Sequence, residues 1–264
     1  MSIDARIRCA AVVAAIVGVA PATAAAQHHH GAPAAAGDEP EAPPFRVGLT
    51  ALAAHFDTGF YAGDYEGLAA SAAWSCGRFG ARAALPLYRL QENGASFVGV
   101  GDAVVGGDAA ILAGAHLRAG VSLAASLPTG DAIEGLGMGH TMLMPAAWAA
   151  YGHRRGAASV SLGYGRALAT GAHHHHGAWP LVEPMNAAEV TASLGGEVAA
   201  WRRLRAGARV AGAVPAGEGG DVRAVAALRA GWSGRSVETA AELQYGLAGD
   251  PFTVRGLVET AFRF

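Results

Sequence analysis

Residues 252–264 read FTVRGLVETAFRF, and this C-terminal stretch decides the fold class. Every second residue, counted from the first Phe, is apolar, Gly or Thr, whereas Arg255, Glu259 and Arg263 all fall between them. Successive side chains of a β-strand point to opposite faces. The stretch is therefore predicted to be a strand with one apolar face and one charged face.

The same alternation recurs upstream in about twelve segments of roughly 10 to 13 residues. Strands that cross a membrane have about this length, whereas ordinary globular strands have about 5 or 6 residues. Scattered Gly disfavours helix in these segments, although the Ala-rich segment 139–150 is compatible with either structure. We expect the segments to start near residues 45, 65, 78, 101, 117, 139, 156, 188, 203, 222, 235 and 252.

Connections of two lengths alternate between these segments. The longer ones are expected near 56–64, 89–100, 128–138, 168–187, 214–221 and 247–251, and the shorter ones near 77, 115, 152, 201 and 233. Outer-membrane barrels have short periplasmic turns and long external loops. Because lipid offers the backbone no hydrogen-bond partners, a spanning sheet must close on itself. We predict an all-β fold: a single transmembrane antiparallel β-barrel of about 12 strands. A secreted sandwich would need a larger, more aromatic buried face.

Aromatic residues are expected at one end of this barrel. Trp74, Trp148, Trp201 and Trp232 are expected beside the short turns, where an aromatic girdle would meet the membrane interface. The terminal Phe264 resembles the signal that barrel-assembly machinery reads in bacterial outer-membrane proteins. Membrane lipid and that machinery are therefore expected partners.

The N-terminus has the order of a secretory signal peptide. Two Arg precede an apolar run at residues 9–20, and small residues follow up to Ala26. The run is short for a membrane anchor, which is the other interpretation. We expect cleavage after residue 26, a flexible His/Pro/Ala-rich leader at 27–44, and a barrel at 45–264 in the bacterial outer membrane.

The charge balance excludes one class of partner. The chain has 19 basic and 21 acidic residues, and nucleic-acid-binding proteins usually carry a basic excess. Ser126 and Ser161 are conceivable nucleophiles, but no His or acidic partner can be identified for them. We therefore expect no nucleic-acid partner, no enzymatic activity and no cofactor.

Two motifs occur in the central segments: Gly99-Val-Gly-Asp102 and Leu127-Pro-Thr-Gly-Asp131, the latter followed by Gly137-Met-Gly-His-Thr141. They resemble the outer-membrane transporter family named after the meta-pathway of phenol degradation. The resemblance covers roughly residues 45–264, and it implies a β-barrel that takes up aromatic or other small molecules. Ala largely replaces the aromatic strand residues of that family.

The two motif aspartates are expected on neighbouring strands at the external rim. Pro128 and Gly130 have the conformational properties of turn residues. Asp102 and Asp131 either cap loops or form a rim site for cations or for an Arg of a gating loop.

The charged face of the segments predicts the lining of the lumen. Charge on a lipid-facing position costs about 2–4 kcal/mol near the midplane, so charged residues are kept inside. Two interpretations remain: a salt-bridged interior, or a graded channel in which Arg favours anionic solutes. The lumen-lining candidates are Arg203, Arg205, Arg209, Arg223, Arg229, Glu238, Glu242, Arg255 and Glu259.

The longest expected loop contains a histidine run, His173, His174, His175 and His176. Neutral imidazole binds Zn, Cu and Ni, so a metal-capturing loop is one interpretation and low-complexity drift is the other.

These features together predict an outer-membrane channel or transporter for small solutes, with aromatic or anionic compounds as candidates. A structural or metal-capturing barrel without an open pore is the alternative.

Overall fold

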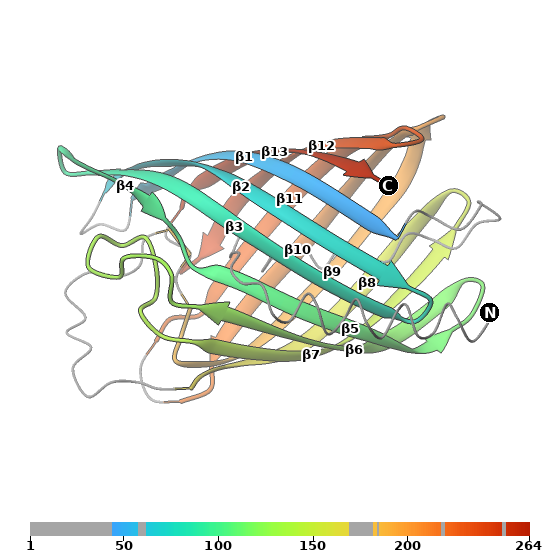
Figure 1. The fold of residues 1–264 in the computed structure, drawn as a ribbon, viewed down its shortest axis with the longest axis horizontal. Helices are drawn as coiled ribbons and strands as arrows, with labels where there is room; N and C mark the ends of the chain where they lie inside the picture. The colour runs from blue at the N-terminus through green and yellow to red at the C-terminus, as the bar shows by residue number, and fades with distance from the viewer. Residues whose placement is uncertain (1–43, 58–61, 169–181, 184, 218–219, 250–251) are drawn as a thin grey trace.

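The computed structural model describes residues 44–264 except 58–61, 169–181, 184, 218–219 and 250–251 (Figure 1). The predicted signal peptide and most of the predicted leader lie outside the described residues. Among the residues that the structure describes, no helix is long and apolar enough to cross a membrane.

The described chain forms one antiparallel sheet that curls into a barrel (Figure 1). Segment 139–150, which the sequence left ambiguous, is strand from Met142 onward. The strands are β1 (Phe45–Asp57), β2 (Ala62–Cys76), β3 (Phe79–Glu92), β4 (Ala95–Val100), β5 (Ala103–Ala113), β6 (Leu117–Leu127), β7 (Met142–His153), β8 (Gly156–Ala167), β9 (Ala188–Trp201), β10 (Leu204–Pro215), β11 (Arg223–Ser233), β12 (Val237–Ala248) and β13 (Val254–Arg263).

The barrel closes where its first and last strands pair. β1 pairs with β2 on one side and β13 on the other, and each later strand pairs with its neighbour. β4 and β5 share β3: β4 pairs with its outer half and β5 with its inner half. They are two parts of one strand interrupted at Gly101 and Asp102, so the predicted twelve-stranded barrel is confirmed. Any side chain at Gly101 would collide with the ring of Tyr88, which explains the glycine at the interruption.

Apolar side chains cover the outside of the barrel. Leu162, Leu194, Val210 and Leu228 come from four consecutive strands and are 50–65% exposed. A water-soluble protein rarely exposes a continuous apolar surface of this kind. The exterior therefore fits lipid, as the alternation in the sequence predicts.

The first and second predicted long loops are shorter than expected, because the strands continue beyond them. Only residues 58–61 separate β1 from β2. β3 and β4 meet at Asn93-Gly94, where φ is +48° and +84°. Asn-Gly favours a two-residue hairpin turn, so this dipeptide was the missed signal.

The tryptophans lie mostly as predicted. Trp201 ends β9, Trp232 lies near the end of β11, and both are exposed; Trp74 lies near the end of β2 but is buried. The predicted position of Trp148 beside a short turn is wrong. Trp148 lies midway along β7, because that strand continues to His153. Tyr151, which is 52% exposed, is closer to the turn.

Phe264 takes part in the β1–β13 seam. Its backbone N–H donates to the Phe45 carbonyl over 2.9 Å, and the Phe45 N–H donates back over 3.4 Å. We predict that deleting Phe264 lowers the heat-modifiable, folded fraction in outer membranes several-fold, because the seam then lacks its last pair.

Two substitutions separate the seam from the terminal aromatic signal. Phe264→Ala keeps the backbone bonds but removes the ring, so it should also lower the folded fraction if assembly machinery reads the ring. Phe45→Ala removes an exposed ring across the same seam and serves as the control. Wild-type folding of both Phe264 variants would contradict the prediction.

Candidate functional site: a charged lumen beneath an apolar constriction

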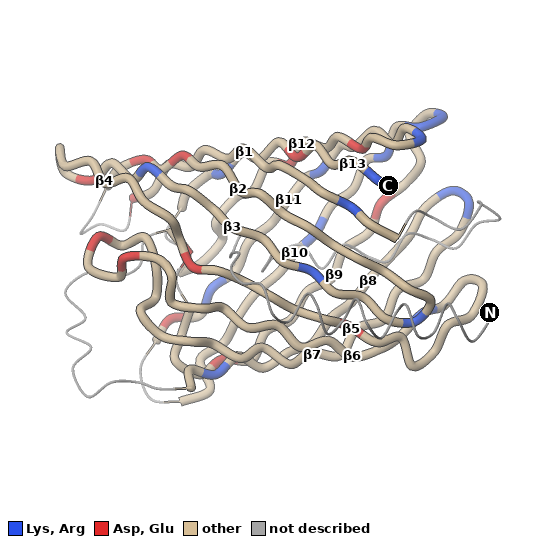
Figure 2. Tube along the Cα trace, viewed as in Figure 1, with Lys and Arg blue, Asp and Glu red and all other residues tan. Residues whose placement is uncertain are grey.

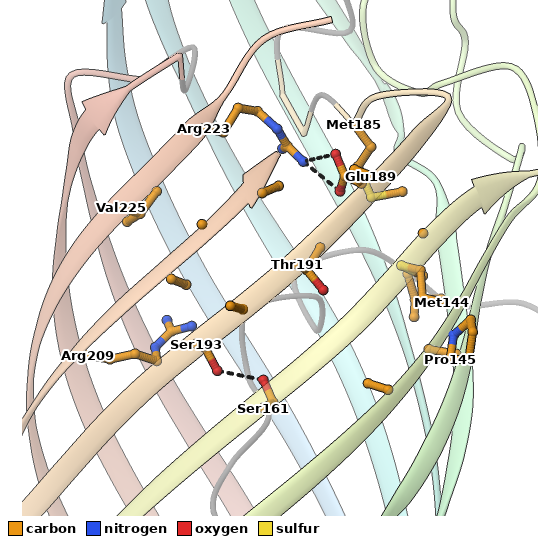
Figure 3. Close-up of a pocket in the computed structure, with 18 of the residues that line it drawn as sticks. Met144, Pro145, Ser161, Met185, Glu189, Thr191, Ser193, Arg209, Arg223 and Val225 are labelled. Carbon is orange, nitrogen blue, oxygen red and sulfur yellow. Dashed lines mark hydrogen bonds and ion pairs between the residues drawn. The ribbon is translucent and has the colours of Figure 1, made fainter. Parts of the chain in front are cut away.

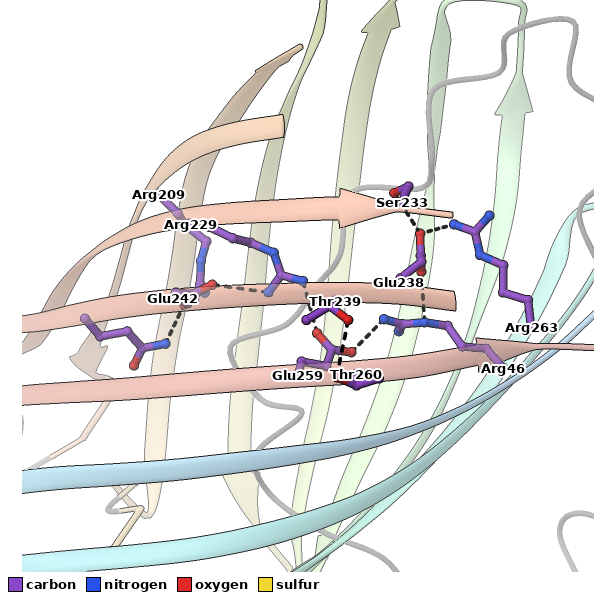
Figure 4. Close-up of polar contacts among 11 residues, drawn as sticks. Arg46, Arg209, Arg229, Ser233, Glu238, Thr239, Glu242, Glu259, Thr260 and Arg263 are labelled. Atoms are coloured by element: carbon purple, nitrogen blue, oxygen red, sulfur yellow. Dashed lines mark hydrogen bonds and ion pairs between the residues drawn. The ribbon is translucent and has the colours of Figure 1, made fainter. Parts of the chain in front are cut away.

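A ladder of ion pairs lines one wall of the lumen, from β10 to β13 and onto β1 (Figure 4). At the short-turn end, Glu238 bonds to Arg263 and lies 3.3 Å from Nε of Arg46. Arg46 Nη2 also donates to Glu259 over 2.6 Å. These contacts join β12, β13 and β1 through their inward side chains.

The ladder continues toward the middle of the barrel. Arg229 lies 3.0 Å from Glu259 and 3.5 Å from Glu242, and Arg209 donates to Glu242 over 2.9 Å. Arg209 and Glu242 come from β10 and β12, which are not adjacent. Side chains of such strands can meet only across the concave inner face. Figure 2 shows that charged residues occur along these strands as well as at their ends.

The upper end of the ladder reaches the long-loop side. Gln244 donates to Glu242 over 2.6 Å and accepts a bond of 2.8 Å from Nε of Arg255. Arg255 also donates to the hydroxyl of Tyr65 over 3.2 Å and lies over the ring of Phe252. A continuous polar line therefore follows the wall from one end to the other.

Most predicted lumen residues lie on inward positions, with one clear exception. Arg205 pairs with Glu197 over 2.6 Å, so this pair extends the pattern to β9. Arg203 lies in the exposed turn before β10, because the strand starts one residue later than predicted. Sequence reasoning missed Arg46, although its alternation with Phe45 and Val47 would have found it.

Glu189 and Arg223 form a buried pair near the mouth. Nη2 of Arg223 lies 2.8 Å and 2.6 Å from the two Glu189 oxygens, and the backbone and side chain of Asn186 donate to the same carboxylate. Asn186 also exchanges two hydrogen bonds with the backbone of Asp221. These hydrogen bonds thus link the segment at the start of β9 to the connection before β11. Glu189 was not among the predicted site residues.

An apolar cluster, here called the mouth cluster, closes the long-loop end of the lumen. Tyr65 and Tyr88 meet edge to face within it, with ring centroids 6.2 Å apart. The cluster contains residues of β3 and of β11, which lie nearly opposite each other in the barrel order. Residues of three connections complete it. Its members are Leu52, Ala54, Phe56, Tyr65, Tyr88, Leu90, Leu136, Val182, Val225, Phe252 and Leu257.

Glu183 is the charged residue beside the mouth cluster. Its Oε1 accepts from the Tyr88 hydroxyl over 3.5 Å and lies 3.8 Å from Arg255. Burial raises the pKa of this carboxyl to about 8, although Arg255 opposes the shift, and the nearby Asp102 adds to it. The connection before β9 therefore places a carboxyl that readily takes up a proton at the constriction.

The two sequence motifs hold the 128–141 connection in place. Asp102 accepts the N–H of Gly130 over 3.0 Å on one oxygen and that of Met138 over 2.6 Å on the other. Thr129 donates to the Gly101 carbonyl over 2.7 Å.

Asp131 has a local role in the same connection. One of its oxygens accepts the N–H groups of Ile133 and Glu134 over 2.8 Å and 3.2 Å. These bonds order the connection, and its Leu136 packs in the mouth cluster. The hydrogen bonds of both aspartates favour the loop-capping interpretation over a cation site.

The predicted metal residues His173–His176 lie outside the described residues. In the part of the chain that is described, no three His, Cys, Asp or Glu residues gather as metal ligands would.

Solved structures with the same architecture were found by comparison. The COG4313 outer membrane channel from Pseudomonas putida F1 matches with a TM-score of 0.64 at 13% identity, over 86% of this chain and 98% of that one. The NanC porin has a TM-score of 0.55 at 8% identity, over 82% and 100%. The KdgM porin has a TM-score of 0.53 at 8% identity, over 83% and 99%.

This chain is an outer-membrane β-barrel. The closed sheet, the lipid-compatible exterior and the likeness in fold agree on this point. No protein-family model matches the sequence, and no curated protein matches it.

We predict that Asp102→Asn loosens the 128–141 connection. Asp102 uses both oxygens, and the amide nitrogen of Asn cannot accept, so one backbone N–H loses its partner at a cost of about 1–3 kcal/mol. Subtilisin cleavage of the barrel, mapped by mass spectrometry, should become roughly 5- to 150-fold faster there, since about 1.4 kcal/mol is tenfold. Asp131→Asn is the matched control, because one remaining oxygen can keep both bonds. Equal cleavage of the two variants would contradict this role of Asp102.

We further predict that the constriction loosens as pH rises. Because burial raises the pKa of Glu183 from 4.5 to about 8, the buried position of its side chain is fully favoured below about pH 4.5. Its contribution to stability is then lost progressively as the pH rises to about 8. The groups that face it are Arg255, Tyr88, Arg223 and Asp102. Single-channel conductance should increase between pH 5 and 9.

Glu183→Gln cannot ionise and should abolish that increase. The exposed Glu66→Gln, on the outer face of β2, is the control and should keep it. A Glu183→Gln protein with the wild-type pH profile would assign the effect to another group.

Proposed function

We propose that the chain is a passive channel for small organic solutes, with aromatic and anionic compounds as the candidate class. The observation that carries the proposal is the charged, hydrogen-bonded inner wall of a closed barrel. Water-filled channels have such an interior.

The resemblance of GVGD and LPTGD to the meta-pathway family supports the aromatic part of this class. We propose membership of that family on these motifs. The two motifs share one structural role, since together they position the connection that carries Leu136 to the mouth.

The ion pairs predict a modest ionic preference. The ladder from the short-turn end to Glu242 holds four arginines (Arg46, Arg209, Arg229 and Arg263) and three glutamates (Glu238, Glu242 and Glu259). Its charge is therefore nearly balanced, with one Arg in excess. Anions should pass somewhat faster than cations.

A barrel without an open pore is the second candidate, and the mouth cluster is the observation that favours it. Apolar constrictions can exclude hydrated ions by dewetting. Such a barrel would have a structural role, or would capture metal through the histidine run. Liposome swelling with small neutral solutes separates the candidates, because a closed barrel gives no swelling.

Reversal potentials in planar bilayers test the ionic preference. Arg209→Glu with Arg229→Glu should reverse it, because the wall becomes negative. A change of one kT in lumen potential alters the local concentration of each monovalent ion roughly threefold, in opposite directions for anions and cations. Arg154→Glu with Arg155→Glu, in the exposed turn between β7 and β8, makes the same change of charge away from the wall. Heat modifiability confirms that both proteins are folded. An unchanged ion ratio in the lumen variant would show that these arginines do not line the path.

A further inference from the structure

A cavity lies against the wall formed by β5 to β11 (Figure 3). About 900 Å³ of empty space, which includes open solvent, lies between its lining residues. Val225 belongs both to its lining and to the mouth cluster. The cavity therefore adjoins the mouth cluster at β11.

One side of the cavity is apolar. Val104 and Ala124 are 2% and 8% exposed, and Met144 packs against them. Met185 comes from the connection before β9 and lies near Glu189 (Figure 3). Thioether side chains adapt to ligands of different shape, so this side suits a compact apolar body.

The facing side is polar and comes mainly from β8, β9 and β10. Ser161 and Ser193 share a hydrogen bond of 2.7 Å, and Thr191 lies next to them in the lining. Each hydroxyl can both donate and accept. This side can receive a polar head group.

The charges of the lining favour an anion. Three guanidinium groups, Arg82, Arg209 and Arg223, line the cavity beside a single carboxylate, Glu189. Glu189 already accepts hydrogen bonds from Arg223 and Asn186, so its oxygens are engaged. Counted over the lining residues alone, positive charge is in excess, although Arg209 also contacts Glu242 outside the lining. A carboxylate head group would complement this excess.

We propose that this cavity is a binding site for small organic monoanions: a carboxylate between Arg209 and the hydroxyls of Thr191 and Ser193, and an apolar body on Val104, Ala124 and Met144. The proposal deepens the channel function and rests on it, since the site would lie on the solute's route. No aromatic residue lines the cavity among the described residues, which disfavours a sugar stacked on a ring.

The test measures binding to the full chain in detergent by isothermal titration calorimetry. The probes are hexanoate, 1-hexanol, hexylammonium and acetate, which vary the head group and the apolar body separately. Hexanoate should bind about tenfold more tightly than hexanol and than acetate, and hexylammonium should not bind. Equal affinity for hexanoate and hexanol, or for hexanoate and acetate, would overturn the proposal.

Variants locate the site. Thr191→Val and Arg209→Gln should each weaken hexanoate binding several-fold and leave hexanol unchanged, whereas Ala211→Leu should fill the cavity and weaken both. Arg154→Gln, in an exposed turn, should bind as the wild type does. Hexanoate binding that survives all three cavity variants would place the ligand elsewhere.

Flux separates this proposal from the channel function. Conductance without hexanoate binding overturns the site but leaves the channel intact. Binding that is lost in the cavity variants, in a protein that gives neither conductance nor swelling, supports the site and overturns the channel.

Discussion

Backbone hydrogen bonding in lipid is the constraint on which the structure depends. A strand edge in the hydrocarbon region would leave N–H and C=O groups without partners, so the sheet has to close. Closure occurs between β1 and β13, which pair from Arg46↔Arg263 to His55↔Val254. The ends of the described barrel, Phe45 and Phe264, therefore lie together.

Closure then gives each strand an inside and an outside, and the alternation of side chains follows from it. Leu162, Leu194, Val210 and Leu228 face outward, whereas the ionic residues of β10 to β13 meet one another inside. Burying an ion pair brings little net stability, but an unpaired charge is costly. This explains why Arg209, Arg229 and Arg46 each contact a Glu. The same pairing limits how strongly the wall can attract anions.

Hydrogen bonds and an ion pair hold two connections on the long-loop side. Asp102 holds one connection through its backbone N–H groups, and the Glu189–Arg223 pair with Asn186 holds another. Both bring apolar residues, Leu136 and Val182, over the lumen. The barrel thus combines a polar wall with an apolar constriction, an arrangement suited to solutes that have both characters.

The sequence by itself determined the class of fold, the strand count and the division between faces, because period two and membrane thickness are local properties of the chain. It also placed Arg209, Arg229, Glu242 and Arg255 on the inner face. Only the tertiary structure decided which Arg meets which Glu, since some of those pairs, such as Arg209–Glu242 and Arg229–Glu259, join strands that are not neighbours. The role of Asp102, the interruption between β4 and β5 and the mouth cluster likewise depend on contacts between segments far apart in the chain. Alternation along one strand carries no information about them.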